Sequence, residues 1–343
     1  MTFLSLAVRA IVNLESLNTV ESVGNLSRHR IAPVVLKTSE KSYSMRYVPV
    51  VSGETIAHAY QSYLVDLAQQ SNLPLGRLTS RHEFIKYSED AYLEGIKGPD
   101  GYEDSRRFEV DVMLYDVVAD IGGFLYAGKK TPVRRTSRFQ VGYMMPALDA
   151  VFSASLESQF HVRMALSLLE KGKAELGQIP YNVEVGSALY TFTFNLDVDG
   201  IAKPSTMAEE SKREKELQEQ RPARIRLALE ALLLLLTGMG FGGKRSRFLP
   251  NTDIRAVGLT ISDRTDFVIS PGNSSNFVDN TIRRAQDMTR MLTTYGLQEK
   301  VKVIAMSREE DLSTLKPEGN VSFINATTAE EVIRICAETV VPT

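Results

Sequence analysis

Alternating apolar and polar residues predict strands in the chain. One face of residues 3–12 is wholly apolar and carries Leu4, Leu6, Val8, Ala10 and Val12. Residues 183–198 alternate in the same way and end at the turn dipeptide Asp199-Gly200. Such a period of two is typical of half-buried strands. Another strand is predicted at residues 254–261.

Helical periodicity predicts two long helices. The first covers residues 53–70, where Ser52 can cap the first turn. One stripe of this helix carries Ile56, Tyr60, Leu64 and Leu67. The second helix begins at Pro222, which suits a first turn, and its apolar body runs from Ile225 to Leu236. We expect it to end at the sequence GMGFGG, because glycine commonly terminates helices.

The C-terminal part predicts four more elements. These are a helix at 277–295, strands at 301–306 and 321–325, and a helix at 328–338 with a capping box of Thr328 and Glu331.

Three other segments show no clear period. We expect residues 13–41 to form a long polar loop and residues 80–120 to form an inserted, mostly helical subdomain. Residues 202–221 are highly charged and predict either a mobile linker or a solvated helical lead-in.

The order of these elements predicts an α+β fold. Strand, helix, insertion, strands, helix and strand follow one another, which is compatible with a ferredoxin-like βαββαβ core that carries large insertions. We assign residues 1–265 to this core and residues 266–343 to a C-terminal α/β extension.

Composition limits the possible functions. The chain has 343 residues, 43% of them hydrophobic, so it can bury a sizeable core. Its single cysteine, Cys336, excludes an intramolecular disulfide and a cysteine metal cluster. The apolar run Ala231 to Leu236 is far shorter than the roughly 20 residues that span a bilayer. We expect a soluble cytoplasmic protein without metal or cofactor.

Charge is informative only through its distribution, because 40 Lys and Arg residues nearly balance 42 Asp and Glu residues. Three windows, Ser22–Ser39, Ile121–Leu148 and Thr237–Thr252, contain basic residues and no acid. Their candidate contacts are Arg28, His29, Arg30, Lys129, Lys130, Arg134, Arg135, Arg138, Lys244, Arg245 and Arg247.

The three windows fit the needs of a phosphate-binding groove. Local positive charge without competing carboxylates attracts phosphates. Glycines in the windows allow close backbone approach, and interspersed aromatic residues can stack on bases. Ordinary solvated loops would have similar sequences, and only a convergence of the windows on one surface would separate the two interpretations.

Two motifs suggest catalysis but fit it poorly. GMGFGGKRS has the glycine and lysine spacing of an NTPase phosphate loop, but Arg245 occupies the position where Ser or Thr must hold Mg²⁺. The loop also follows a helix where a phosphate loop follows a strand. No two of the four histidines have metal-ligand spacing. His161 could act as a general base for RNA cleavage, or could only form hydrogen bonds.

Longer segments resemble a known family. LNTVESVGNLSRHRIAP, YVPVVSGETIAHAY, SRFQVGYMMPALDAVFSASLESQFHVR and GMGFGGKRSRFLP are similar to the DevR-type autoregulator family of CRISPR-associated proteins, within the RAMP superfamily. The likeness is greatest to the archaeal type I-A backbone subunits of Cascade, and it runs through most of residues 1–261.

This resemblance implies a modified RNA-recognition-motif core with a palm-and-thumb shape. Such subunits form helical filaments along one CRISPR RNA, contact other Cascade subunits, hold the RNA backbone and leave bases free to pair with target DNA. Carried over to this sequence, the implied RNA contacts are Asn25, Arg28, His29, Arg30, His161, Arg163, Lys244, Arg245 and Arg247.

Two alternatives remain open at this stage. An endoribonuclease of the same superfamily would use His29 or His161. A transcriptional regulator would bind duplex DNA, yet no helix-turn-helix pattern with a basic recognition helix is present. The aromatic signature with which ordinary RNA-recognition motifs stack bases is also absent. We therefore predict binding through the RNA backbone and shape, without base readout.

Overall fold

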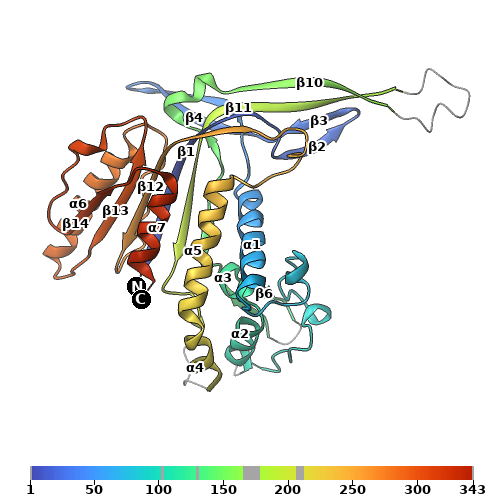
Figure 1. Ribbon diagram of the computed structural model, residues 1–343, viewed down its shortest axis with the longest axis vertical. Coiled ribbons are helices and arrows are strands. Elements are labelled where there is room, and N and C mark those ends of the chain that lie inside the picture. The colour runs from blue at the N-terminus through green and yellow to red at the C-terminus, as the bar shows by residue number, and fades with distance from the viewer. Residues whose placement is uncertain (1, 102–103, 129–130, 165–177, 206–211, 342–343) are drawn as a thin grey trace, which may run out of the picture.

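The computed structural model describes residues 2–101, 104–128, 131–164, 178–205 and 212–341. The expected α+β class is confirmed: one large mixed sheet carries helices on both faces (Figure 1). Among the described residues, no helix is both long and apolar enough to cross a membrane.

The centre of the sheet consists of four strands in the order β12-β1-β11-β10, and each neighbouring pair is antiparallel. These strands are β1 (Phe3–Glu15), β10 (Ser155–Met164), β11 (Gln178–Asp197) and β12 (Asn251–Ser262). Two helices connect them on one face, α1 (Gly53–Gln70) and α5 (Arg221–Gly238). This order and these crossovers match the βαββαβ arrangement expected from the sequence.

The core forms where the sequence predicted it. The apolar face of β1 is buried against α1 and α5, and Leu6, Tyr60 and Leu232 share this cluster. The opposite face of β1 is buried as well, because Ala7 packs under the C-terminal helix α6 (Phe277–Thr294). Both faces of β1 are therefore buried from Phe3 to Ala10, whereas Asn13 and Leu14 near its end are exposed.

The C-terminal elements extend the same sheet. Strand β13 (Val301–Ser307) pairs antiparallel with β12, and β14 (Val321–Asn325) pairs parallel with β13. Helix α7 (Ala329–Val340) packs on the α5 face, opposite α6. The four predicted element types are confirmed.

The buried Arg9 of β1 joins the core to this extension. Its guanidinium forms ion pairs with Asp149 at 3.1 Å and with Glu309 at 2.6 Å.

An insertion separates α1 from β10. It contains α2 (Asp104–Tyr115), α3 (Val117–Gly122), β6 (Phe124–Tyr126), β7 (Val133–Arg135), β8 (Phe139–Val141) and β9 (Met145–Pro146). Helix α3, Phe124 and Tyr126 form a small core with α2. Strands β8 and β9 pair with β11, which anchors the insertion to the main sheet. Helix α4 (Lys212–Glu219) precedes α5, so the charged segment is helical over these residues.

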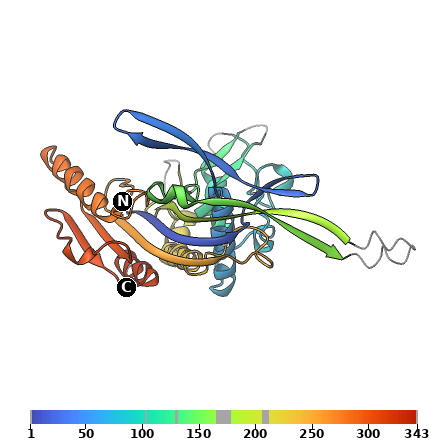
Figure 2. The same ribbon diagram turned by 90° about the horizontal axis from the view of Figure 1, so that it is seen from above.

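The prediction of a long loop at 13–41 is wrong. This region forms β2 (Thr19–Val23), β3 (Leu26–His29), β4 (Ile31–Ser39) and β5 (Ser42–Pro49). Strands β2 and β3 form a hairpin beside β11, and β4 and β5 form a separate two-stranded ribbon. In Figure 2 the β4–β5 ribbon and the β10–β11 hairpin extend from the body in different directions. These thin ribbons bury few side chains, and hydrophobic residues such as Val35, Tyr43 and Tyr47 are exposed on them, so their sequence does not mark a buried face.

Candidate nucleic-acid interface

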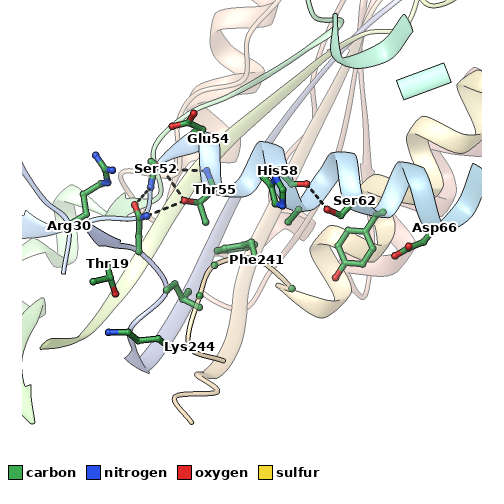
Figure 3. Close-up of a pocket in the computed structure, with 17 residues that line it drawn as sticks. Thr19, Arg30, Ser52, Glu54, Thr55, His58, Ser62, Asp66, Phe241 and Lys244 are labelled. Atoms are coloured by element: carbon green, nitrogen blue, oxygen red, sulfur yellow. Dashed lines mark hydrogen bonds between the residues drawn. The ribbon is translucent and has the colours of Figure 1, made fainter. Parts of the chain in front are cut away.

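An open groove of about 760 Å³ lies along the first turns of α1. Three segments that are distant in sequence form its walls: Leu17–Thr19, residues 54–66 of α1, and the glycine-rich loop at 240–244. Arg30 also lines the groove. Figure 3 shows Arg30, Thr19 and Lys244 at the end where α1 begins, with His58 and Asp66 farther along the helix. The first and third basic windows thus meet at one site.

Asn18 holds two walls of the groove together. Its Oδ1 accepts a hydrogen bond from the Ser52 backbone N–H at 2.9 Å, and its Nδ2 donates to the Thr55 hydroxyl at 3.2 Å. Its carbonyl oxygen accepts from the Arg30 N–H at 2.8 Å. Asn18 therefore fixes the start of α1 through its side chain and the residue after β3 through its backbone.

The glycine-rich loop packs directly on Leu17. The Gly243 N–H donates to the Leu17 carbonyl oxygen at 2.8 Å. Gly242 has φ +84°, and a Cβ added there would lie 2.6 Å from the Leu17 Cβ. Glycine is needed at this position both for its backbone conformation and for its close contact. This contact sets where Lys244, the next basic residue, enters the groove.

The charge in the groove is uneven. Lys244 and Arg30 lie near the N-terminus of α1, where Ser52 accepts a hydrogen bond from the Thr55 N–H at 3.3 Å. The helix dipole adds partial positive charge at this end. Burial lowers the pKa of the Lys244 ammonium group. No atom of the described residues accepts a hydrogen bond from its shielded Nζ.

Carboxylates also line the groove. Glu54 lies in the first turn of α1, at the same end as Arg30 and Lys244 (Figure 3), whereas Asp66 lies farther along the helix, 3.3 Å from the His82 imidazole. The end with Arg30, Lys244 and the helix N-terminus has the donors that suit a phosphate, with Glu54 as a competing charge.

A second set of side chains continues from the glycine-rich loop onto the β10–β11 hairpin. Tyr181 stacks on His161 with ring centroids 5.3 Å apart, and the Arg163 guanidinium lies 5.6 Å from the centre of the Tyr181 ring. Phe248 meets the His161 ring edge-on at 5.4 Å. Basic and aromatic groups thus lie together, as single-stranded nucleic acid requires.

Sequence reasoning did not find Tyr181 or Asn18. Tyr181 is the cross-strand partner of His161, but β10 was not predicted and the pairing was therefore not visible. Asn18 lay in the segment interpreted as a loop, and nothing in its sequence marks it.

The β2–β3 hairpin carries two predicted contacts on its surface. Asn25 is exposed in the turn, and its carbonyl oxygen accepts a hydrogen bond from the Asn182 N–H of β11 at 2.7 Å. Arg28 is exposed and pairs with Glu21 at 3.1 Å. Both side chains remain accessible to a ligand.

Two predicted contacts are corrected by the structure. His29 is 3% exposed and its ring lies 2.7 Å from Glu15. Arg135 is 2% exposed, and its guanidinium pairs with Glu109 at 2.9 Å and with Asp120. Neither side chain can reach a surface ligand. The His29 form of the endoribonuclease hypothesis fails for the same reason.

The basic residues of the second window lie outside the groove. Arg134 is exposed on β7 of the insertion, and Arg138 pairs with Asp197 of β11 at 3.0 Å. Lys129 and Lys130 lie outside the described residues. Two of the three windows therefore converge among the described residues.

The fold and the site define an α+β protein built on an antiparallel βαββαβ sheet, with an open, locally basic groove beside a long hairpin. The family model described as CRISPR-associated negative auto-regulator DevR/Csa2 matches residues 6–282, and the chain belongs to this family.

Its relatives include two proteins of Saccharolobus solfataricus. The chain is 54% identical over 281 residues to the CRISPR-associated aCascade subunit Cas7/Csa2 2, which covers 81% of this chain and 85% of the relative. It is 39% identical over 308 residues to the CRISPR-associated protein Cas7/Csa2 1, which covers 87% and 93%.

The fold is also found in solved assemblies. Chains from a CRISPR RNA-guided surveillance complex and from its pre-nicking form match with TM-scores of 0.50 and 0.52, at 10% identity. Each match covers 98% of this chain and 99% of the other.

Proposed function

We propose that this protein is a non-catalytic scaffold subunit that binds the phosphate backbone of CRISPR RNA without regard to sequence. Copies of the chain associate along the guide, contact other subunits of the surveillance complex, and leave the bases free to pair with target DNA. The observation that carries the proposal is the meeting of two acid-free basic windows at one groove, next to the aromatic surface around Tyr181.

The chemistry of the groove supports backbone binding over base readout. Arg30 and Lys244 offer cationic donors, which bind phosphates of any sequence. Tyr181 and Phe248 offer aromatic rings, and stacking on such rings is tolerant of base identity. The names of the relatives add support, because one of them is called an aCascade subunit.

The test uses fluorescence anisotropy to measure equilibrium binding of the purified protein to two unrelated single-stranded RNAs of about 40 nucleotides. The proposal predicts similar affinities for both RNAs, weaker binding of duplex DNA, and intact RNA after incubation. A strong preference for one RNA, or for a specific duplex, would overturn it. Cleaved RNA would instead favour the endoribonuclease, with His161 as its remaining candidate base.

A further inference from the structure

His29 is a buried histidine between two oxygen atoms. Its Nε2 lies 2.7 Å from Oε1 of Glu15, in an ion pair that is not aligned as a hydrogen bond. Its Nδ1 lies 2.8 Å from the carbonyl oxygen of Arg30. A neutral imidazole carries a proton on only one nitrogen, and a deprotonated Nε2 would turn its lone pair toward the Glu15 carboxylate, so the doubly protonated, charged ring is the form that suits both oxygen atoms.

Glu15 is the matching anion, and its side chain is fully buried. A register shift in β1 between Val12 and Glu15, with Leu14 at φ +57°, places Glu15 after an irregularity in the strand. Its Oε1 also accepts a hydrogen bond from the Tyr190 hydroxyl at 2.8 Å. Its Oε2 accepts from the Leu17 N–H at 2.8 Å.

The ion pair is linked to both sides of the groove. On one side, Glu15 holds the Leu17 N–H, and the Leu17 carbonyl oxygen accepts from Gly243, the residue before Lys244. On the other side, His29 holds the carbonyl oxygen of Arg30, whose side chain lines the groove. The His29–Glu15 pair thus fixes the backbone near Arg30 on one side of the groove and near Lys244 on the other.

We propose that the His29–Glu15 ion pair positions Arg30 and Lys244 relative to each other, so that RNA affinity depends on a proton held by a residue that does not touch RNA. The inference rests on the proposed function of the groove. It assigns to His29 a role different from the direct contact predicted from the sequence.

The charged groups around His29 act in one direction. Burial alone would lower its pKa, but Glu15 of β1 and the Arg30 carbonyl outweigh burial, and Glu184 of β11 adds to them, so the pKa is raised. Glu184 also accepts a hydrogen bond from the His29 N–H at 2.7 Å. The Tyr190 hydroxyl of β11 faces the same carboxylate oxygen. RNA affinity should therefore be constant while His29 is charged and should fall as the pH rises through its raised pKa.

The experiment follows RNA affinity from about pH 6 to about pH 9.5 at constant ionic strength, together with the NMR titration of the His29 ring. Wild-type protein, His29→Gln and Tyr190→Phe are compared. Tyr190→Phe is the matched control, because it removes a neighbour of Glu15 and leaves the ion pair intact. A thermal melt of each variant reports its folding.

The expected result is a fall in affinity whose midpoint coincides with the NMR midpoint of His29. His29→Gln should bind about tenfold more weakly at low pH and should lose this transition, as expected for a residue that acts without touching the ligand. Tyr190→Phe should keep it. The wild-type titrations carry the test even where His29→Gln does not fold.

Two other outcomes would separate the failure of the positioning role from the failure of the proposed function. RNA binding that is independent of pH, or that changes at a midpoint different from that of His29, overturns the positioning role and leaves the proposed function standing. Absence of RNA binding at every pH overturns both.

Discussion

Arg247 donates a hydrogen bond from Nη1 to the hydroxyl of Tyr181, 3.4 Å away. Arg247 follows the glycine-rich loop, whereas Tyr181 belongs to β11, so this contact joins the groove to the β10–β11 hairpin. The two surfaces form one continuous candidate path for RNA.

Replacing Tyr181 tests this path. In Tyr181→Ala, His161 loses its stacking partner and Arg163 loses the ring beneath it. We expect RNA affinity to fall about tenfold, in the range of one lost base–aromatic stack. Tyr181→Phe keeps the ring and should stay close to wild type in the same anisotropy assay. Equal affinity in all three proteins would remove the hairpin from the RNA path.

Gly242 tests the packing of the glycine-rich loop. Gly242→Ala must adopt φ +84° and bring its Cβ to 2.6 Å from Leu17. We expect the free energy of unfolding to fall by about 1–3 kcal/mol in chemical denaturation, with weaker RNA binding. Gly243→Ala is the control, because its nearest neighbour would be the Leu17 carbonyl oxygen at 3.9 Å. A stable, fully binding Gly242→Ala protein would show that the loop position is not fixed by this contact.

The His29–Glu15 pair predicts how stability varies with pH. The pKa of His29 is raised above 6.5, so its contribution is complete below that value and is lost as the pH rises through the folded-state pKa. Burial opposes ionisation of Glu15, but His29 and the Leu17 N–H lower its pKa below 4.5, so its contribution is complete above that value and is lost as the pH falls.

Denaturation curves collected across this range should therefore show a stability maximum between the two limits. His29→Gln should flatten the alkaline side. An unchanged alkaline slope in His29→Gln would contradict the ion pair.

Arg135 and its neighbour separate structural from surface roles. The Arg135 guanidinium is fully buried between Glu109 and Asp120, and Arg224 pairs with Asp120 at 2.8 Å. Arg135→Ala leaves buried carboxylates without this partner and should cost about 3–5 kcal/mol. Arg134→Ala, at an exposed site, should change stability by less than about 0.5 kcal/mol. Weaker RNA binding by fully folded Arg135→Ala would contradict this assignment.

The sequence predicted the long elements well and the ribbons poorly. Strand β1 and helix α1 were found because their apolar residues follow one period over many positions. The capping box was confirmed in its main contact, since the Glu331 N–H donates to the Thr328 hydroxyl at 3.1 Å. Its return contact differs, because Glu331 accepts from the Thr327 N–H. Strands β2 to β5 were missed because they form thin ribbons that bury few side chains, so no apolar stripe marks a buried face.

The two wrong contacts have one physical cause. Side chains alternate between the two faces of a strand. In β3, Arg28 points to solvent and His29 points inward. In β7, Arg134 points outward and Arg135 inward. A basic dipeptide looks like a surface feature as long as its strand is not predicted, and the buried carboxylates that receive the inward residue come from distant parts of the chain.

The convergence of the basic windows depends on tertiary structure. Arg30 and Lys244 meet because Asn18 and Leu17 bind their backbone neighbours, and no local pattern encodes those contacts. The second window has the same composition, yet its arginines lie in the insertion. The charge pattern therefore predicted three basic windows, and the fold brings residues of two of them to one groove.

The most direct test of the account is the salt dependence of RNA binding in a charge-reversal variant and its matched control. The variant is Lys244→Glu, Arg245→Glu, Arg247→Glu. The control, Arg283→Glu, Arg290→Glu, Arg334→Glu, reverses three exposed charges on α6 and α7. If Lys244, Arg245 and Arg247 all contact phosphates, the plot of log affinity against log salt should become less steep by about 2 in the variant and stay unchanged in the control. Equal slopes in wild type, variant and control would contradict backbone binding at this groove.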